Sequence, residues 1–187
     1  MKNPDLQPAT PARFIREACE EGRLLGKAEL LQLLRERPAT PDVPVSPLEK
    51  FEEEISGALA EDPDLFVVRG PEGEEFYRHA SLMSATYAEI LVGKQAPCLL
   101  IAETVRKNSK EYPRPIALDI FEYPPFDLDP ESIQACLQHM AEAADFGDIS
   151  FVESSAGTVY LYSKMYLDHD YAAFLAERLD VDLALNP

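Results

Sequence analysis

The chain has 187 residues, of which 46% are hydrophobic and 27% charged, as is typical of globular domains. Its net charge is −17, and a field of that sign repels nucleic-acid phosphates and anionic membranes. No apolar run reaches the roughly 18 residues that span a bilayer, and the N-terminus lacks the apolar region of a secretory signal. We therefore expect a cytoplasmic protein that has no membrane as a partner.

The first predicted helices follow a flexible tail at residues 1–9. Thr10 and Pro11 combine an N-cap with a proline at the first helical position, which predicts a helix to about residue 21. A second helix is expected over residues 24–37, where leucines recur at helical spacing until a proline.

A proline-rich loop is predicted at residues 38–47, and its end carries the signal for a third helix. Ser46, Pro47 and Glu49 form a capping box, in which a serine caps the helix and a glutamate reaches back to it. The outer face of that helix is expected to be acidic.

A hairpin is predicted next, with strands at residues 65–69 and 74–78 on either side of Gly73. Ser84 is the expected N-cap of a helix that ends near Gly93. The order of three helices and a hairpin resembles a winged helix. The resemblance implies a winged-helix-like fold for the first half.

The second half begins with a dense apolar run at residues 97–105, which periodicity alone does not assign to helix or strand. Residues 116–121 lie between prolines and predict a strand. Asp129 and Pro130 repeat the cap-plus-proline pair and start a helix to about residue 144.

A second hairpin is predicted from residues 149–153 and 158–162 around Gly157. Asp168 is the expected N-cap of a last helix, which should end at Leu179. The second half therefore ends on the same plan as the first.

The two hairpin regions also match in sequence. Residues 64–91 align without a gap with residues 148–175, 84 positions later, and six of the 28 positions are identical. The identical pairs are Asp64/Asp148, Val68/Val152, Gly73/Gly157, Tyr87/Tyr171, Ala88/Ala172 and Leu91/Leu175. Such a repeat indicates a scaffold of two related modules.

We predict an α+β fold made of two related modules, each a helix–β-hairpin–helix repeat. The first is expected to be winged-helix-like and the second to carry a larger antiparallel sheet. The predicted divisions are a tail at 1–9, a winged-helix-like module at 10–94, a connection at 95–114, a second α+β module at 115–180 and a tail at 181–187.

Three cysteines, Cys19, Cys98 and Cys136, are an odd and scattered set. This pattern favours reduced thiols over a disulfide framework, and their expected role is that of small buried hydrophobic residues.

The candidate binding patch is the basic cluster at residues 106–114, in a half that is otherwise acidic. Its candidate residues are Arg106, Lys107, Lys110, Tyr112 and Arg114. Such a patch can bind phosphate, a carboxylate or an acidic peptide. The alternative is a solvated connection whose cations pair with the chain's own acids.

A second candidate surface is aromatic. Tyr77, Tyr160, Tyr162 and Tyr166 are the candidate interface residues, because tyrosine combines a large apolar ring with a polar tip. The alternative is that these rings pack each hairpin against its following helix.

No catalytic, cofactor or metal residues are predicted. The sequence contains no nucleophile elbow, phosphate loop or dinucleotide fingerprint. His169 lies between two aspartates, but adjacent residues at a helix start point in different directions, so they do not form a metal site.

The expected function is that of a non-enzymatic interaction or regulatory protein that binds a protein partner through its tandem modules. One alternative is a nucleic-acid-binding regulator that uses residues 106–114, although the helices placed to read DNA are acidic. Another is an uncharacterised enzyme or ligand sensor with a site between the modules.

Overall fold

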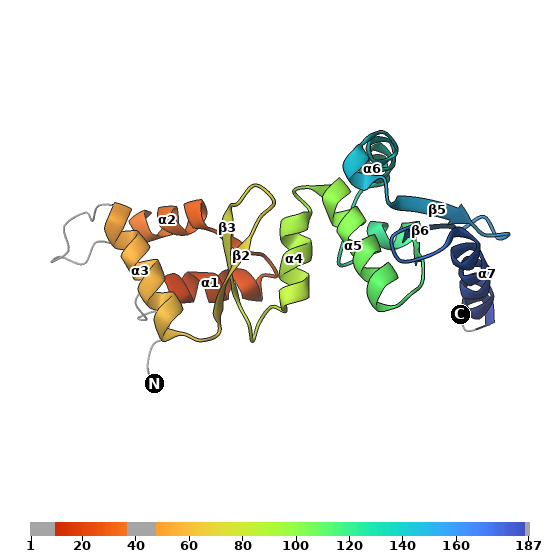
Figure 1. Ribbon diagram of the computed structural model, residues 1–187. Coiled ribbons are helices and arrows are strands. Elements are labelled where there is room, and N and C mark those ends of the chain that lie inside the picture. The colour runs from red at the N-terminus through yellow and green to blue at the C-terminus, as the bar shows by residue number, and fades with distance from the viewer. Residues whose placement is uncertain (1–9, 37–47, 186–187) are drawn as a thin grey trace. The chain divides into compact units, whose positions relative to one another are not determined.

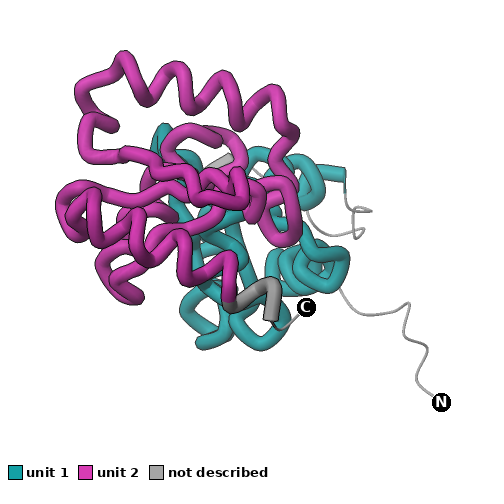
Figure 2. The backbone as a smooth tube through the Cα atoms, turned by 90° about the vertical axis from the view of Figure 1, so that its right-hand side faces the viewer, with its two compact units in different colours: residues 1–92 teal, residues 93–187 magenta. Residues whose placement is uncertain are grey.

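The computed structural model describes residues 10–36 and 48–185 and has a mixed α+β fold. The described residues form seven α-helices and two three-stranded antiparallel sheets. They divide into two compact units, residues 1–92 and residues 93–187, coloured separately in Figure 2. The predicted tail at 1–9 and the loop at 38–47, with its Ser46 cap, lie outside the described residues.

The first unit combines helices with a small sheet (Figure 1). β3 is the central strand, and it pairs with β1 on one side and β2 on the other. The elements in chain order are α1 (Pro11–Glu20), β1 (Leu25–Gly26), α2 (Lys27–Glu36), α3 (Leu48–Glu61), β2 (Leu65–Arg69), β3 (Glu75–His79) and α4 (Ala85–Gly93).

The core of the first unit forms where its helices pack on this sheet. The Thr10 side chain caps α1 by accepting a hydrogen bond from the Arg13 N–H, as predicted. Ile15 and Ala18 lie on the buried face of α1, because positions three residues apart share one side of a helix. They pack with the buried side chains of Leu25, Leu30, Leu34, Ile55, Leu65 and Tyr77.

The second unit has its own sheet, in which β6 is the central strand between β4 and β5. Its elements in chain order are α5 (Pro97–Glu111), β4 (Ile116–Ala117), the 3₁₀ helix η2 (Leu118–Glu122), α6 (Pro130–Glu142), the 3₁₀ helix η3 (Ala144–Phe146), β5 (Ile149–Glu153), β6 (Val159–Ser163) and α7 (His169–Leu185).

Small side chains let α7 pack closely in the second unit. Ala172 and Ala176 are fully buried and belong to one cluster with Val152, Tyr160 and Tyr162. Asp168 caps the helix by accepting from the Asp170 and Tyr171 N–H groups, as predicted. α7 continues to Leu185, beyond the predicted end at Leu179.

The two hairpins have the same register. Leu65 pairs with His79, and Ile149 pairs with Ser163, each residue 84 positions after its counterpart. Gly73 and Gly157 lie in the two turns with φ of +87° and +85°. These positive values suit glycine, since a Cβ atom makes the left-handed region costly.

Two predicted elements differ from the structure, and one region that was left open is assigned by it. Leu25 forms strand β1 instead of starting the second helix, because it is fully buried opposite Tyr77. Residues 97–105, which periodicity left open, belong to helix α5. The strand predicted at 116–121 keeps only Ile116–Ala117.

The rest of that predicted strand forms the 3₁₀ helix η2. Phe121 is fully buried there, and its ring contacts the Phe126 ring at 4.9 Å between centroids. The prediction of a larger sheet in the second half is therefore wrong: both sheets have strands of two, five and five residues.

The cysteines also correct a prediction. Cys98 on α5 and Cys136 on α6 form a disulfide, with their Cα atoms 4.9 Å apart and 38 positions between them in sequence. Only Cys19 is a free thiol, and burial raises its pKa. An odd number of cysteines therefore did not exclude one pair.

Among the described residues, no helix combines the length and the apolar character needed to cross a membrane.

Candidate functional site

The predicted basic cluster is divided by the fold. Arg106 forms a two-pronged ion pair with Asp148, from Nε to Oδ2 at 3.0 Å and from Nη2 to Oδ1 at 2.6 Å. The Asp148 carboxylate raises the pKa of Arg106, and a further hydrogen bond from Nη1 to Glu103 adds to that rise. Arg106 is thus committed to holding α5 against the start of β5.

The other four residues of the cluster are exposed. Lys107 and Lys110 lie on α5, and Tyr112 and Arg114 follow it. The Arg114 guanidinium lies 5.8 Å from the centre of the Tyr112 ring. The candidate patch is therefore reduced to four solvent-facing side chains.

Three of the four candidate interface tyrosines lie in the cores. Tyr77, Tyr160 and Tyr162 are buried, and Tyr166 is exposed. The Tyr160 hydroxyl donates to Asp180 at 2.7 Å, and the Tyr162 hydroxyl lies 3.0 Å from Nδ1 of His169. These rings pack the second hairpin against α7, so Tyr166 alone keeps the exposure that an interface residue needs.

An apolar stripe runs along the exposed side of α7. Tyr171, Phe174 and Val181 are 50%, 55% and 56% exposed, and the Arg178 guanidinium lies over the Phe174 ring at 5.9 Å. Their spacing of three, four and three residues places all four on one side of the helix. We call these four residues the α7 stripe, and it lies opposite the buried alanines of the same helix.

Another group of polar side chains meets in the first unit, where α3 ends and the hairpin begins. Asp62 follows α3, Asp64 precedes β2, and His79 ends β3 opposite Leu65. One ligand atom from each of the three polar side chains lies within 4.8 Å of the other two. We call Asp62, Asp64 and His79 the Asp–Asp–His cluster.

His79 is the buried member of this cluster, with 4% of its surface exposed. Its backbone N–H donates to Sγ of Cys19 at 3.3 Å, and its ring Nδ1 lies 2.8 Å from the Ser81 hydroxyl oxygen. Its Nε2 atom is buried and has no hydrogen-bond partner among the described residues. That atom lies 3.7 Å from Oδ2 of Asp62.

Asp62 connects the cluster to solvent. It accepts one hydrogen bond from the Asp64 N–H and another from Nη2 of Arg16 at 2.9 Å. These partners lower the pKa of Asp62, the Asp64 N–H most of all. The carboxylate is therefore ionised at neutral pH.

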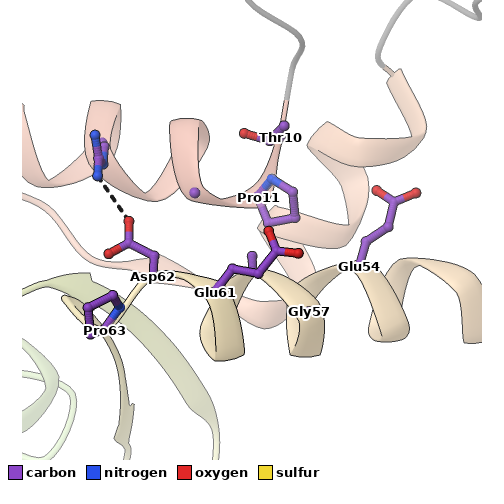
Figure 3. A pocket seen from close by; sticks show the side chains of 10 residues that line it. Thr10, Pro11, Glu54, Gly57, Glu61, Asp62 and Pro63 are labelled. Carbon is purple, nitrogen blue, oxygen red and sulfur yellow. Dashed lines mark hydrogen bonds and ion pairs between the residues drawn. The ribbon is translucent and has the colours of Figure 1, made fainter.

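Asp62 also lines a hollow of about 610 Å³ between α1 and α3. Figure 3 shows Glu54, Glu61 and Asp62 along the α3 side, with Thr10 and Pro11 at the start of α1. Arg16 is the only basic residue among the described residues that line the hollow. Its lining is acidic, so it suits a cation better than an anion.

Sequence reasoning missed the Asp–Asp–His cluster because its members are spread over 18 residues. A signal was present in the hairpin. Pairing the strands symmetrically about Glu72 places His79 opposite Leu65, and hence beside Asp64. The aspartates around His169, by contrast, serve α7: Asp168 is its N-cap, as predicted, and Asp170 is an acid in its first turn.

Comparisons with known proteins give a relationship without an activity. Residues 95–184 match the model of a family described as the YdhW C-terminal domain. The chain is similar to a protein of Escherichia coli (strain K12) described as uncharacterized protein YdhW, with 28% identity over 184 residues that cover 94% of this chain and 79% of that protein. No solved structure matches the chain. The matched family region lies within the second compact unit.

Proposed function

We propose that this chain is a non-enzymatic interaction or regulatory protein, which binds a protein partner through its second unit. The α7 stripe carries the proposal. Two aromatic rings and a valine stay exposed on the side of α7 that faces away from its core. Aromatic and arginine side chains of this kind are enriched where proteins bind each other.

The stripe favours a helical partner. Residues at positions 171, 174, 178 and 181 follow the alternating three- and four-residue spacing of a coiled-coil seam. Two exposed acids, Asp170 and Glu177, lie along one edge of the stripe, and Glu177 also accepts hydrogen bonds from the Ser155 N–H and hydroxyl. A partner helix with an apolar face and basic flanks would complement both features.

The proposal includes the finer description of the scaffold, a winged-helix-like first unit and a second unit related to it. Both units run in the order helix, short strand, helical segment, helix, hairpin, helix, if η2 takes the place of α2 and η3 is an extra element of the second unit. The sheet orders β1-β3-β2 and β4-β6-β5 correspond, and the hairpin registers differ by 84 positions throughout. These equivalences support duplication of one module.

A cytoplasmic location is also part of the proposal. The nucleic-acid alternative has less support. Arg106 is paired with Asp148, so only three of the four cations of the cluster remain available to bind phosphate.

The test is a pull-down of the tagged full chain from its source cells, with and without nuclease, read by mass spectrometry. We expect a stoichiometric protein partner that survives nuclease and is lost from Phe174→Ser and Tyr171→Ser. Leu82→Ser is the matched control, because it removes an exposed apolar side chain (44% exposed) from the first unit. A partner retained by both stripe variants, or one released by nuclease, would contradict the proposal.

A further inference from the structure

We infer that the Asp–Asp–His cluster is a binding site for a divalent transition-metal ion of the zinc class. The main evidence is that Nε2 of His79 is a buried ring nitrogen without a hydrogen-bond partner among the described residues. It faces a carboxylate oxygen of Asp62 at 3.7 Å. A buried polar atom without a partner is costly, and a bound cation would remove that cost. This inference does not depend on the proposed protein partner.

The donor set selects the class of ion. One imidazole nitrogen and two carboxylate oxygens suit zinc and its neighbours, whereas magnesium and calcium prefer oxygen ligands alone. Two ligands at about 2.0–2.2 Å from a tetrahedral zinc lie roughly 3.4 Å apart. The His79–Asp62 separation of 3.7 Å is already close to that value. The exposed Asp64 side chain has the freedom to approach.

The surroundings of His79 fit the orientation of a metal ligand. Ligating histidines usually donate their second ring N–H to an oxygen, which fixes the ring and the tautomer. Here the Ser81 hydroxyl lies 2.8 Å from Nδ1. When that nitrogen carries the proton, Nε2 presents its lone pair toward the two aspartates.

Arg16 acts as the counter-cation of the cluster without an ion. Its guanidinium binds the same Asp62 oxygen that faces His79, at 2.9 Å. Half of the Arg16 side chain is exposed (52%), so it can leave toward solvent when a dication arrives. The ion would reach the cluster through the acidic hollow that Arg16 and Asp62 line.

The second unit shows the same place without a site. Asp148 and Ser163 stand 84 positions after Asp64 and His79. There the Ser163 hydroxyl donates to Asp148 at 2.7 Å, and Arg106 binds the same carboxylate. The first unit has histidine where the second has serine, and one ring nitrogen of that histidine is left without a hydrogen bond. At the equivalent place in the second unit, Ser163 and Arg106 are both bonded to Asp148.

The test is Zn²⁺ binding to the full chain, measured by equilibrium dialysis with metal analysis and by competition with a chromophoric chelator. We expect one Zn²⁺ per chain that excess Mg²⁺ does not displace. Asp64→Asn and His79→Gln should each lower the affinity at least about tenfold. Asp145→Asn, which removes an exposed carboxylate of the second unit, should leave the affinity unchanged.

Arg16→Gln gives a result of opposite sign. It should raise the affinity about two- to fivefold, because an exposed ion pair that competes with the metal is lost. A Zn²⁺-induced shift of the His79 ring ¹⁵N resonances, with His139 and His169 unmoved, tests the site without any variant. Equal binding by Asp64→Asn, dependence on Cys19 alone, or silent His79 resonances would overturn the inference.

Discussion

Asp148 receives three hydrogen bonds that tie one carboxylate to two separate elements of its unit. Nε and Nη2 of Arg106 on α5 donate to its two oxygens, and the Ser163 hydroxyl at the end of β6 donates to Oδ2. The Asp148 and Arg106 side chains are 14% and 23% exposed. This ion pair is thus mostly shielded from water, and such shielding strengthens its charge-assisted hydrogen bonds.

Replacing Asp148 by Asn should therefore destabilise the chain by about 2–4 kcal/mol, because the Arg106 charge would remain without its carboxylate. Arg106 lowers the pKa of Asp148 below its ordinary value of 3.8. The stabilisation is complete above that value and is lost as the pH falls below it. Urea unfolding of the parent chain and of Asp148→Asn should show a difference in unfolding free energy that becomes smaller below pH 4. A difference independent of pH would contradict this assignment, and Asp145→Asn is the control.

Gly73→Ala and Gly157→Ala should lower the stability by similar amounts, about 1 kcal/mol each. Both residues have a positive φ, and an added Cβ would meet nothing within 4 Å at either position, so the backbone conformation is the whole cause. Gly57→Ala within α3 is the control of opposite sign, since alanine favours a helix. Denaturant midpoints measure all three, and clearly unequal costs at the two turns would contradict their equivalence.

Reduction of the Cys98–Cys136 disulfide should lower the stability by about 4 kcal/mol, from the chain entropy of a loop with a separation of 38 residues. Cys136→Ser should give the same loss. In denaturant, thiol titration should find one group before reduction and three after it. Cytoplasmic proteins rarely keep such bonds. Thiol counts on protein quenched with acid in its source cells therefore also test the proposed location.

Tyr160→Phe should destabilise the second unit by about 1–2 kcal/mol, since the buried hydroxyl donates to Asp180. Burial, with help from Asp180, raises the pKa of Tyr160 above its ordinary value of 10.0. A raised pKa adds stability below pH 10 that is lost as the pH rises further. The difference between the two proteins should shrink above pH 10. Tyr166→Phe, at an exposed ring, should have little effect by the same denaturation measurement.

Much of the secondary structure could be predicted from short signals in the sequence. The helix starts at Thr10, Asp129 and Asp168 follow directly from capping chemistry, and the structure contains all three hydrogen bonds. Both hairpin turns follow from a glycine between alternating segments. These elements were predictable because neighbours in the sequence decide them.

Features decided by distant partners were not predictable in this way. The two-residue strand β1 exists because Leu25 pairs with Tyr77, and two residues carry no periodicity. The disulfide depends on α5 and α6 lying side by side. Tyrosines at 160 and 162 have the composition of an interface, yet the α7 alanines bury them. Only the three-dimensional packing separates a core ring from a surface ring.

The bond between Cys98 and Cys136 turns the chain between them into a closed ring. That ring contains nearly all of α5, then β4, η2 and the first half of α6, and Tyr123 within it is 60% exposed. A protease that cuts once at such a turn opens the ring but releases no fragment. While the disulfide is intact, the two sides of the cut stay covalently joined, and the sheet of this unit keeps its third strand within reach.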